Sequence, residues 1–151
     1  MKLLASACLL GINCKYNGKN NKNNKILELL KDHDLIPVCP EILGGLPTPR
    51  IPSEIQNNKV ITKDGRDVTK EYQKGAEETL KIAKLYGCKI AILKEKSPSC
   101  GCGKIYDGTF TTNLISGDGI TARLLKENNI KIIGETSKQI DQLKTWGESH
   151  E

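Results

Sequence analysis

Short, continuously apolar runs alternate along the chain with segments whose apolar residues recur at helical spacing. Such runs are typical of strands that are buried on both faces of a parallel sheet. They occupy residues 2–9, 35–39, 89–94 and 130–134. Apolar residues that repeat every three or four positions predict amphipathic helices between these runs. The predicted helices span residues 24–34, 69–87, 117–129 and 136–147.

The order strand–helix, repeated about four times, predicts the α/β fold class. We expect a Rossmann-like open sheet of about four parallel strands, with right-handed crossovers, flanking helices and one or two small β-hairpins. No internal repeat or break in composition marks a boundary, so residues 1–151 are predicted to form one domain.

Two segments between the predicted elements are rich in residues that form turns. Four of the six prolines lie within residues 40–52, and this density predicts an extended, stiff loop without a helix or a central strand. Residues 60–69 predict a small β-hairpin that turns at Asp64-Gly65, and a second Asp-Gly turn lies in residues 106–113. Loops of this length in a compact domain are usually functional.

Composition narrows the class of protein. The chain has 151 residues, of which 37% are hydrophobic, and no apolar run reaches the roughly 20 residues that a membrane-spanning helix needs. The apolar run at the N-terminus is short and fits a first buried strand better than a signal peptide, so we expect a cytoplasmic protein with no membrane partner. In the reducing cytosol, six cysteines indicate a metal site or catalysis more often than disulfides.

The charge of the chain is positive, but its composition disfavours a nucleic-acid partner. The net charge is +5, and lysine supplies 20 of the 23 basic residues. Arginine and aromatic side chains, which proteins use to bind and stack nucleic-acid bases, number only three and six. A metal-stabilised nucleic-acid-binding module is therefore kept only as an alternative function.

Three cysteines follow three of the predicted strands. Cys8 lies at the end of the first, Cys39 at the end of the second, and Cys100 in the loop after the third. The carboxyl ends of parallel strands meet at one edge of an open sheet, where such folds bind ligands, so we expect these thiols to converge. The alternative role, as small core residues, suits Cys88, which lies between a helix end and a strand.

The clustered thiols are compatible with several kinds of site. Zinc is disfavoured because the chain has no Cys-x-x-Cys pair, and because His33 and His150 lie on a predicted helix and in the tail. A nucleophilic Cys100 would need a histidine partner. Three thiolates and one open position suit a 4Fe–4S cluster with one iron free to bind substrate. Cys102 could be a fourth ligand, and Cys14 is then left over.

Six blocks of sequence stand out as long motifs. They read SACLLG, PVCPEILGGLPTPR, GRDVT, LKEKSPSCG, YDGTF and GDGITARLL. In composition and order they resemble the signature blocks of the thiouracil desulfurases, and the resemblance covers residues 2–135. It implies an oxygen-sensitive 4Fe–4S cluster on Cys8, Cys39 and Cys100, with one open iron.

The resemblance also implies an activity. The enzyme would remove sulfur from a small thiolated pyrimidine, converting 2- or 4-thiouracil to uracil and hydrogen sulfide without net redox change. A sulfur carrier that does not turn over the free base would share this site and is a second alternative.

Polar residues near these cysteines are the candidates for catalysis and substrate binding. Glu41, two residues after Cys39, is the candidate general base within reach of a bound substrate, because no histidine is well placed. Arg50 could bind a pyrimidine carbonyl or pin the proline-rich loop. Ser97 and Ser99 are candidates for catalysis or substrate contact, and their alternative role is to cap the local turn.

Overall fold

A computed structural model describes residues 1–144 of the protein, and a parallel sheet of four strands lies at its centre. The predicted α/β class, with an open sheet of about four parallel strands, is confirmed. In the spatial order β2-β1-β5-β8, the strands are Asp34–Val38, Lys2–Ser6, Ile90–Leu93 and Lys131–Gly134.

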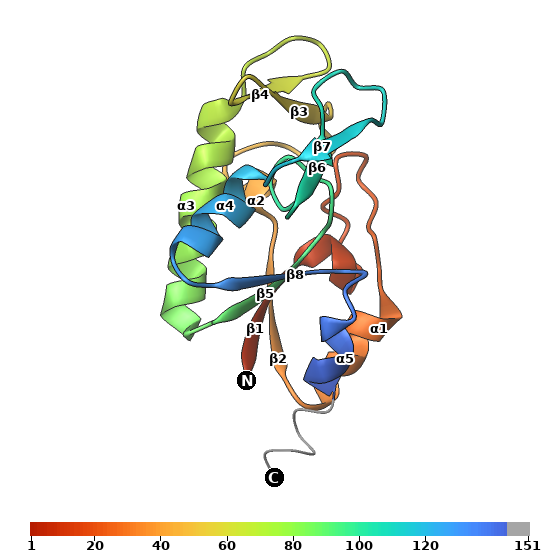
Figure 1. The fold of residues 1–151 in the computed structure, drawn as a ribbon, viewed down its shortest axis with the longest axis vertical. Helices are drawn as coiled ribbons and strands as arrows, with labels where there is room; N and C mark the ends of the chain where they lie inside the picture. The colour runs from red at the N-terminus through yellow and green to blue at the C-terminus, as the bar shows by residue number, and fades with distance from the viewer. Residues whose placement is uncertain (145–151) are drawn as a thin grey trace.

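Helices cover both faces of this sheet (Figure 1). On one face, α3 (Thr69–Tyr86) packs beside α4 (Ile120–Glu127). The other face is covered by α1 (Asn24–Leu27), the 3-10 turn η2 (Glu28–Lys31) and α5 (Gln139–Lys144). The last helix was predicted to continue through residues 145–147, which lie outside the described residues.

Coverage of both faces explains why the strands are continuously apolar. Leu3 and Leu4 are both fully buried, but Leu3 packs on the side of α1 and α5, whereas Leu4 packs on the side of α3 and α4. In β5, Ile92 faces the first side, while Ala91 and Leu93 face the second. A polar side chain at these positions would lose its contact with water on either face.

Two small antiparallel hairpins lie beyond the carboxyl ends of the sheet (Figure 1). In one, β3 (Ser53–Gln56) pairs with β4 (Lys59–Thr62), and in the other, β6 (Lys104–Tyr106) pairs with β7 (Leu114–Ser116). The second hairpin contains the predicted Asp-Gly turn.

The first hairpin differs from the one predicted over residues 60–69. The chain does turn at Gly65, where φ is 89°, but the isolated bridge between Ile61 and Asp67 follows the turn instead of a strand. β4 pairs along its length with β3, across a turn at Asn57-Asn58, where φ is 50° and 64°. Asparagine tolerates this left-handed conformation, so the Asn-Asn pair was the available signal for the turn.

The prediction that the proline-rich segment contains no helix is wrong. Residues Pro40–Leu43 form the short helix α2, with Pro40 at its first position. Proline fits there because that residue donates no hydrogen bond within the helix and its φ angle is already helical. Residues 44–52, which follow, do form a loop without helix or strand.

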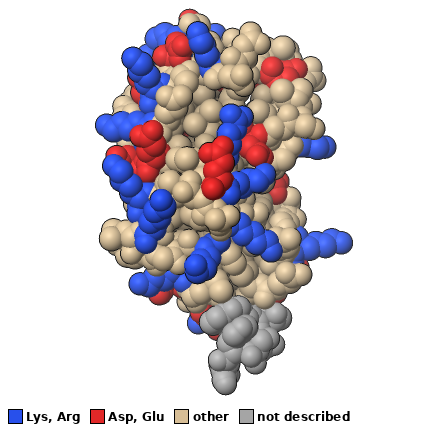
Figure 2. All heavy atoms as spheres, turned by 60° about the vertical axis from the view of Figure 1, so that its left-hand side comes forward, with Lys and Arg blue, Asp and Glu red and all other residues tan. Residues whose placement is uncertain are grey.

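Two further features of residues 1–144 are the character of the helices and the distribution of charge on one side of the molecule. None of its helices is both long and apolar enough to cross a membrane. On the side of the molecule that carries α3, lysine and arginine side chains are interspersed with aspartate and glutamate (Figure 2).

Candidate active site at the carboxyl ends of the strands

A cavity of about 500 Å³ lies at the carboxyl ends of the central strands. Its walls come from the turns after β1, β2 and β5 and from the two hairpins. Cys8, Cys39 and Cys100 all line it, and all three are free thiols. The structure thus brings together the three cysteines whose convergence the strand order predicted.

Cys8 lies in η1 (Ala7–Leu10), the 3-10 turn that directly follows β1, and not in the strand itself, which was predicted to continue to residue 9 but ends at Ser6. Its carbonyl oxygen accepts a hydrogen bond from Asn21 N at 2.9 Å, and Asn21 Nδ2 donates to Cys8 Sγ at 3.5 Å. Burial raises the pKa of the Cys8 thiol, and the hydrogen bond from Asn21 opposes that rise by stabilising the thiolate. Asn21 was not singled out in the sequence, because an asparagine in an Asn-rich loop carries no local signal of such a contact.

Cys39 occupies the N-cap position of α2, directly after β2. This short helix packs on α3 so closely that backbone meets backbone. A Cβ atom on Gly44 would lie 1.9 Å from Glu71 O, and one on Gly75 would lie 1.9 Å from Pro40 O. The absence of side chains at both glycines therefore sets the position of α2, and with it the position of Cys39.

Glu41, in the first turn of α2, lies at the cavity beside Cys39. Its Oε2 atom lies 2.9 Å from Arg50 Nη2 and 3.6 Å from Cys39 Sγ. The side chain is only 15% exposed. Burial raises the pKa of the Glu41 carboxyl group, while the Arg50 guanidinium opposes that rise. The geometry thus places a carboxylate next to a predicted iron ligand.

Arg50 ties together the segments around Glu41. Its guanidinium donates to Pro47 O at 3.3 Å, to Thr48 Oγ1 at 3.1 Å and to Cys14 O at 2.9 Å, besides its ion pair with Glu41. These contacts pin the proline-rich loop, which is one of the two roles predicted for this residue. Arg50 also lines the cavity, and its contact with a substrate stays a prediction.

The structure separates Ser97 from Ser99. Ser97 lines the cavity, and its Oγ accepts a hydrogen bond from Cys100 N at 2.7 Å, which leaves its own hydrogen to be donated. Ser99 is fully buried outside the cavity lining, with its Oγ 2.8 Å from Thr121 Oγ1. Burial raises the pKa of the Cys100 thiol, and hydrogen bonds from Ser6 and Ser99 oppose that rise. The position of Ser99 therefore favours support of Cys100 over direct contact with a substrate.

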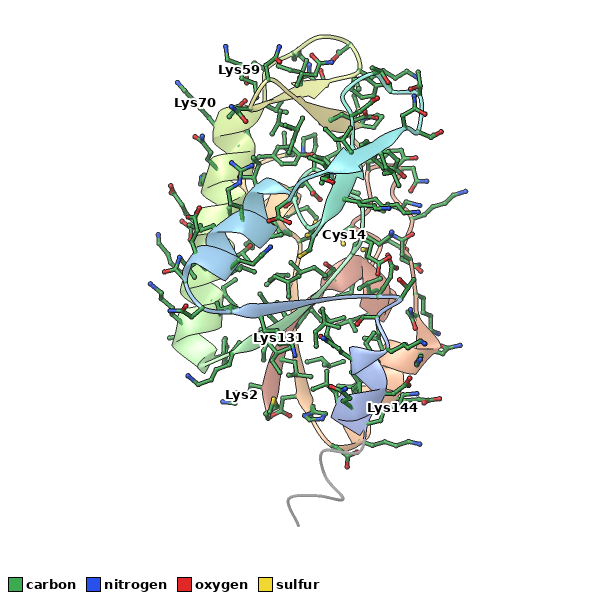
Figure 3. All side chains as sticks on the ribbon, viewed as in Figure 1. Lys2, Cys14, Lys59, Lys70, Lys131 and Lys144 are labelled. Atoms are coloured by element: carbon green, nitrogen blue, oxygen red, sulfur yellow. The ribbon has the colours of Figure 1, made fainter. Side chains whose placement is uncertain are left out.

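Cys14 is a fourth thiol in the cavity wall, to which the sequence assigned no role. It lies between the central sheet and the β6–β7 hairpin (Figure 3) and is 4% exposed. Its carbonyl oxygen lies 3.7 Å from Cys39 Sγ. The neighbouring Cys14 thiol lowers the pKa of the Cys39 thiol, while the pKa of Cys14 is raised by Cys39 and by burial.

The two remaining cysteines lie away from this wall. Cys88 is buried in the core between the sheet and α3, in contact with the cluster that contains Ala83 and Ala91, as predicted. Cys102 borders a separate shallow depression beside Lys126 and is not among the residues that line the cavity.

The donor set of the cavity fits an iron–sulfur cluster, because thiolates are its usual ligands. Cationic side chains in the cavity lining favour thiolates and the negative charge of a thiolate-bound cluster. They are Lys15, Arg50, Lys63 and Lys94. Within residues 1–144, no group of three or more His, Cys, Asp or Glu side chains is arranged to hold a single metal ion. In a cluster each cysteine binds its own iron, so thiols that line one cavity without meeting at a single point can still be ligands of one cluster.

Comparison with known proteins supports the assignment of this cavity to an iron–sulfur cluster. The family model described as 2-thiouracil desulfurase matches residues 3–137. The uncharacterized protein YbbK of Bacillus subtilis (strain 168) is 44% identical, with 88% of this chain and 95% of that protein covered. A solved structure of the 4Fe–4S-dependent thiouracil desulfidase TudS has a TM-score of 0.86 and 41% identity, and 94% of each chain is covered. The predicted resemblance to an enzyme family is confirmed: the chain belongs to the 2-thiouracil desulfurase family.

Proposed function

We propose that this protein removes sulfur from a small thiolated pyrimidine base. 2-Thiouracil or 4-thiouracil would react with water to give uracil and hydrogen sulfide, with no net change in oxidation state. The proposal is carried by the convergence of Cys8, Cys39 and Cys100 with Glu41 at one cavity, in a chain of the 2-thiouracil desulfurase family. The similarity to TudS, named as a 4Fe–4S-dependent thiouracil desulfidase, supports it.

Three of the four cysteines that line the cavity, Cys8, Cys39 and Cys100, would hold a 4Fe–4S cluster with one iron left without a cysteine ligand. When bound, the cluster supplies a Lewis acid that prefers sulfur to oxygen ligands and polarises the thiocarbonyl group. The chain contributes three thiols fixed by the turns after three strands. A cavity of about 500 Å³ also falls in the range of roughly 300–1,000 Å³ that is usual for small-molecule sites.

Glu41 would act as the general base. Arg50 engages Oε2 of its carboxylate, and the other carboxylate oxygen can accept a proton from the attacking water. Water then supplies the new carbonyl oxygen of uracil. Glu41 returns this proton to the departing sulfur. The hydroxyl group now on the ring carbon loses the second proton as it becomes the carbonyl of uracil, and that proton also passes to the sulfur. Both hydrogens of hydrogen sulfide thus come from water, and the reaction balances without an oxidant or reductant.

Ser97 and Arg50 would orient the base. The Ser97 hydroxyl, whose oxygen already accepts from Cys100 N, can donate its hydrogen to a carbonyl or ring nitrogen at the cavity. Arg50 holds Glu41 in place and lies at the same wall, where it can also meet a pyrimidine carbonyl. Ser99 would support Cys100 from the interior, where its hydrogen bond with Thr121 holds it in place.

The test is purification without oxygen, followed by measurement of iron and acid-labile sulfide and by addition of 2-thiouracil and 4-thiouracil in separate reactions. We expect about four iron atoms per chain and equal amounts of uracil and hydrogen sulfide from at least one base. Zinc in place of iron would contradict the proposal and favour the metal-stabilised binding module. A full cluster with no turnover of either base would contradict it in favour of a sulfur carrier.

Gly119 gives a prediction about how Cys100 is held. Its φ of −65° and ψ of 163° suit any residue, but a Cβ atom there would lie 2.4 Å from Ser99 O and 2.9 Å from Cys100 N. We expect Gly119→Ala to displace the Cys100 backbone, to lower the iron content of protein prepared without oxygen, and to reduce the free energy of unfolding by about 1–3 kcal/mol.

Gly117→Ala is the matched control for this variant. A Cβ atom at Gly117 would first meet the flexible end of the Ile105 side chain, at 3.1 Å, so we expect nearly normal iron content. Equal iron loading in both variants would show that the close approach of Gly119 does not position Cys100.

A further inference from the structure

Aromatic residues are scarce in this chain, yet four of the five within residues 1–144 line the candidate active site. The four are Tyr16, Tyr72, Tyr106 and Phe110, whereas Tyr86 lies elsewhere. We propose that Phe110 is the residue on which the planar substrate stacks, and that the buried carboxylate of Glu54 positions it. This inference rests on the proposed function, because it states how that site holds its base.

The backbone of Phe110 is held in an unusual conformation. Its φ is 59°, and Thr112, two residues later in the same cavity-lining loop, has a φ of 65°. Bulky and β-branched residues are rarely found in this left-handed region, and they stay there only where their surroundings impose it. An aromatic residue that is strained in this way at a cavity wall indicates a functional placement.

Glu54 imposes this conformation. It lies in β3 and is 8% exposed, and its Oε1 accepts hydrogen bonds from Gly108 N at 3.0 Å and from Phe110 N at 3.1 Å. From the same strand, Gln56 Nε2 donates to Gly108 O at 2.6 Å. Side chains of β3 therefore hold the loop by hydrogen bonds, although this strand lies more than 50 residues earlier in the sequence.

Gly108 allows the loop to lie directly on that strand. Its φ is 93°, and a Cβ atom there would lie 2.7 Å from Ile55 O. Any side chain at this position would push the loop away from Glu54. The position of Phe110 is thus set by β3 as well as by the β6–β7 hairpin that carries it.

Two of the other three aromatic residues of the cavity, Tyr72 and Tyr16, are less well placed to stack on a base. Tyr72 packs in a buried cluster with Val60 and Val68. The ring of Tyr16 is paired with the Lys15 ammonium group, 5.7 Å from its centroid. Phe110 has no polar group to satisfy and presents an apolar ring, which suits a heteroaromatic base of any substitution pattern.

The first test measures KM and kcat for 4-thiouracil, and the dissociation constant of uracil by titration calorimetry, on cluster-loaded enzyme. We expect Phe110→Leu, which keeps the apolar volume, to raise KM and the uracil dissociation constant about tenfold, with kcat much less affected. Phe110→Tyr, which keeps the ring, should restore both. Tyr86→Ala, an aromatic truncation outside the cavity, is the control and should leave both unchanged.

The second test addresses Glu54 as a positioning residue. Glu54→Ala leaves two backbone N–H groups without their acceptor and should raise KM in the same way, whereas Glu54→Gln keeps a carbonyl oxygen for them and should restore it. Because Glu54 is proposed to act through Phe110, Glu54→Ala should add little to KM in the Phe110→Leu background. Fully additive effects, or a lower melting temperature with unchanged KM, would overturn the positioning role.

The measurements separate this inference from the proposed function. Normal turnover with unchanged KM and uracil binding in Phe110→Leu would overturn the stacking role and leave the desulfurase proposal standing. A loss in Tyr106→Leu but not in Phe110→Leu would also overturn it, by moving the stacking role to Tyr106. A wild-type enzyme that binds uracil but converts no thiouracil would contradict the desulfurase proposal, while weaker uracil binding in Phe110→Leu would still support stacking.

Discussion

Replacement of Cys100 by serine is expected to abolish stable iron binding. Cys100 is 4% exposed and lines the cavity with Cys8 and Cys39, so the variant would leave two of the three proposed ligands for the cluster. A hydroxyl group is a much poorer ligand than a thiolate for iron–sulfur centres. Iron and acid-labile sulfide, measured after purification without oxygen, should fall to a small fraction of the wild-type values, and turnover should fall with them.

Cys88→Ala is the matched control, because Cys88 is equally buried, at 5% exposed, but lies in the core away from the cavity. It should keep the cluster and the activity, with a modest loss of thermal stability from the small cavity that the truncation leaves. Normal iron in Cys100→Ser would remove Cys100 from the ligand set. Loss of iron in Cys88→Ala would show instead that the cluster is sensitive to any change in the core.

Glu41→Gln is expected to keep the cluster and lose turnover. General base catalysis typically contributes about 10²–10⁴-fold to the rate, so kcat should fall in this range. The amide of the variant would not be able to take the proton from water, although it is close in shape to the carboxylate. Arg50 would keep its contacts with Pro47, Thr48 and Cys14, which favours an intact site. Iron content, melting temperature, kcat and KM should be measured together.

Glu95→Gln provides the control for a carboxylate that lines the same cavity. Its Oε1 accepts hydrogen bonds from Thr136 N at 2.9 Å and from Thr136 Oγ1 at 2.6 Å, so it has a local structural role. We expect a change in kcat well below that of Glu41→Gln. A fully active Glu41→Gln enzyme would exclude Glu41 as the base, whereas a parallel loss of iron and activity would show that its main role is to hold Cys39 and Arg50.

The pattern of apolar residues along the sequence was sufficient to predict the central sheet and the convergence of the three cysteines. Strands covered on both faces must be apolar at successive positions, as Leu3 and Leu4 are, and this requirement leaves a local signal in the sequence. The position of Cys8, Cys39 and Cys100 after three such strands then follows from the geometry of a parallel sheet. Both features depend on local patterns, namely the apolar run of each strand and the cysteine that lies shortly after it.

Contacts between distant segments could be decided only by the tertiary structure. Nothing near Ser99 distinguishes it from Ser97, and it is Thr121 that holds Ser99 in the interior. Glu54 carries no local sign of its hydrogen bonds to the loop at Phe110. Such roles depend on which backbone and side-chain atoms meet after the elements have packed together. The sequence by itself therefore determined the sheet and the order of its strands along the chain, while packing decided which side chains face the cavity and which ones support them from behind.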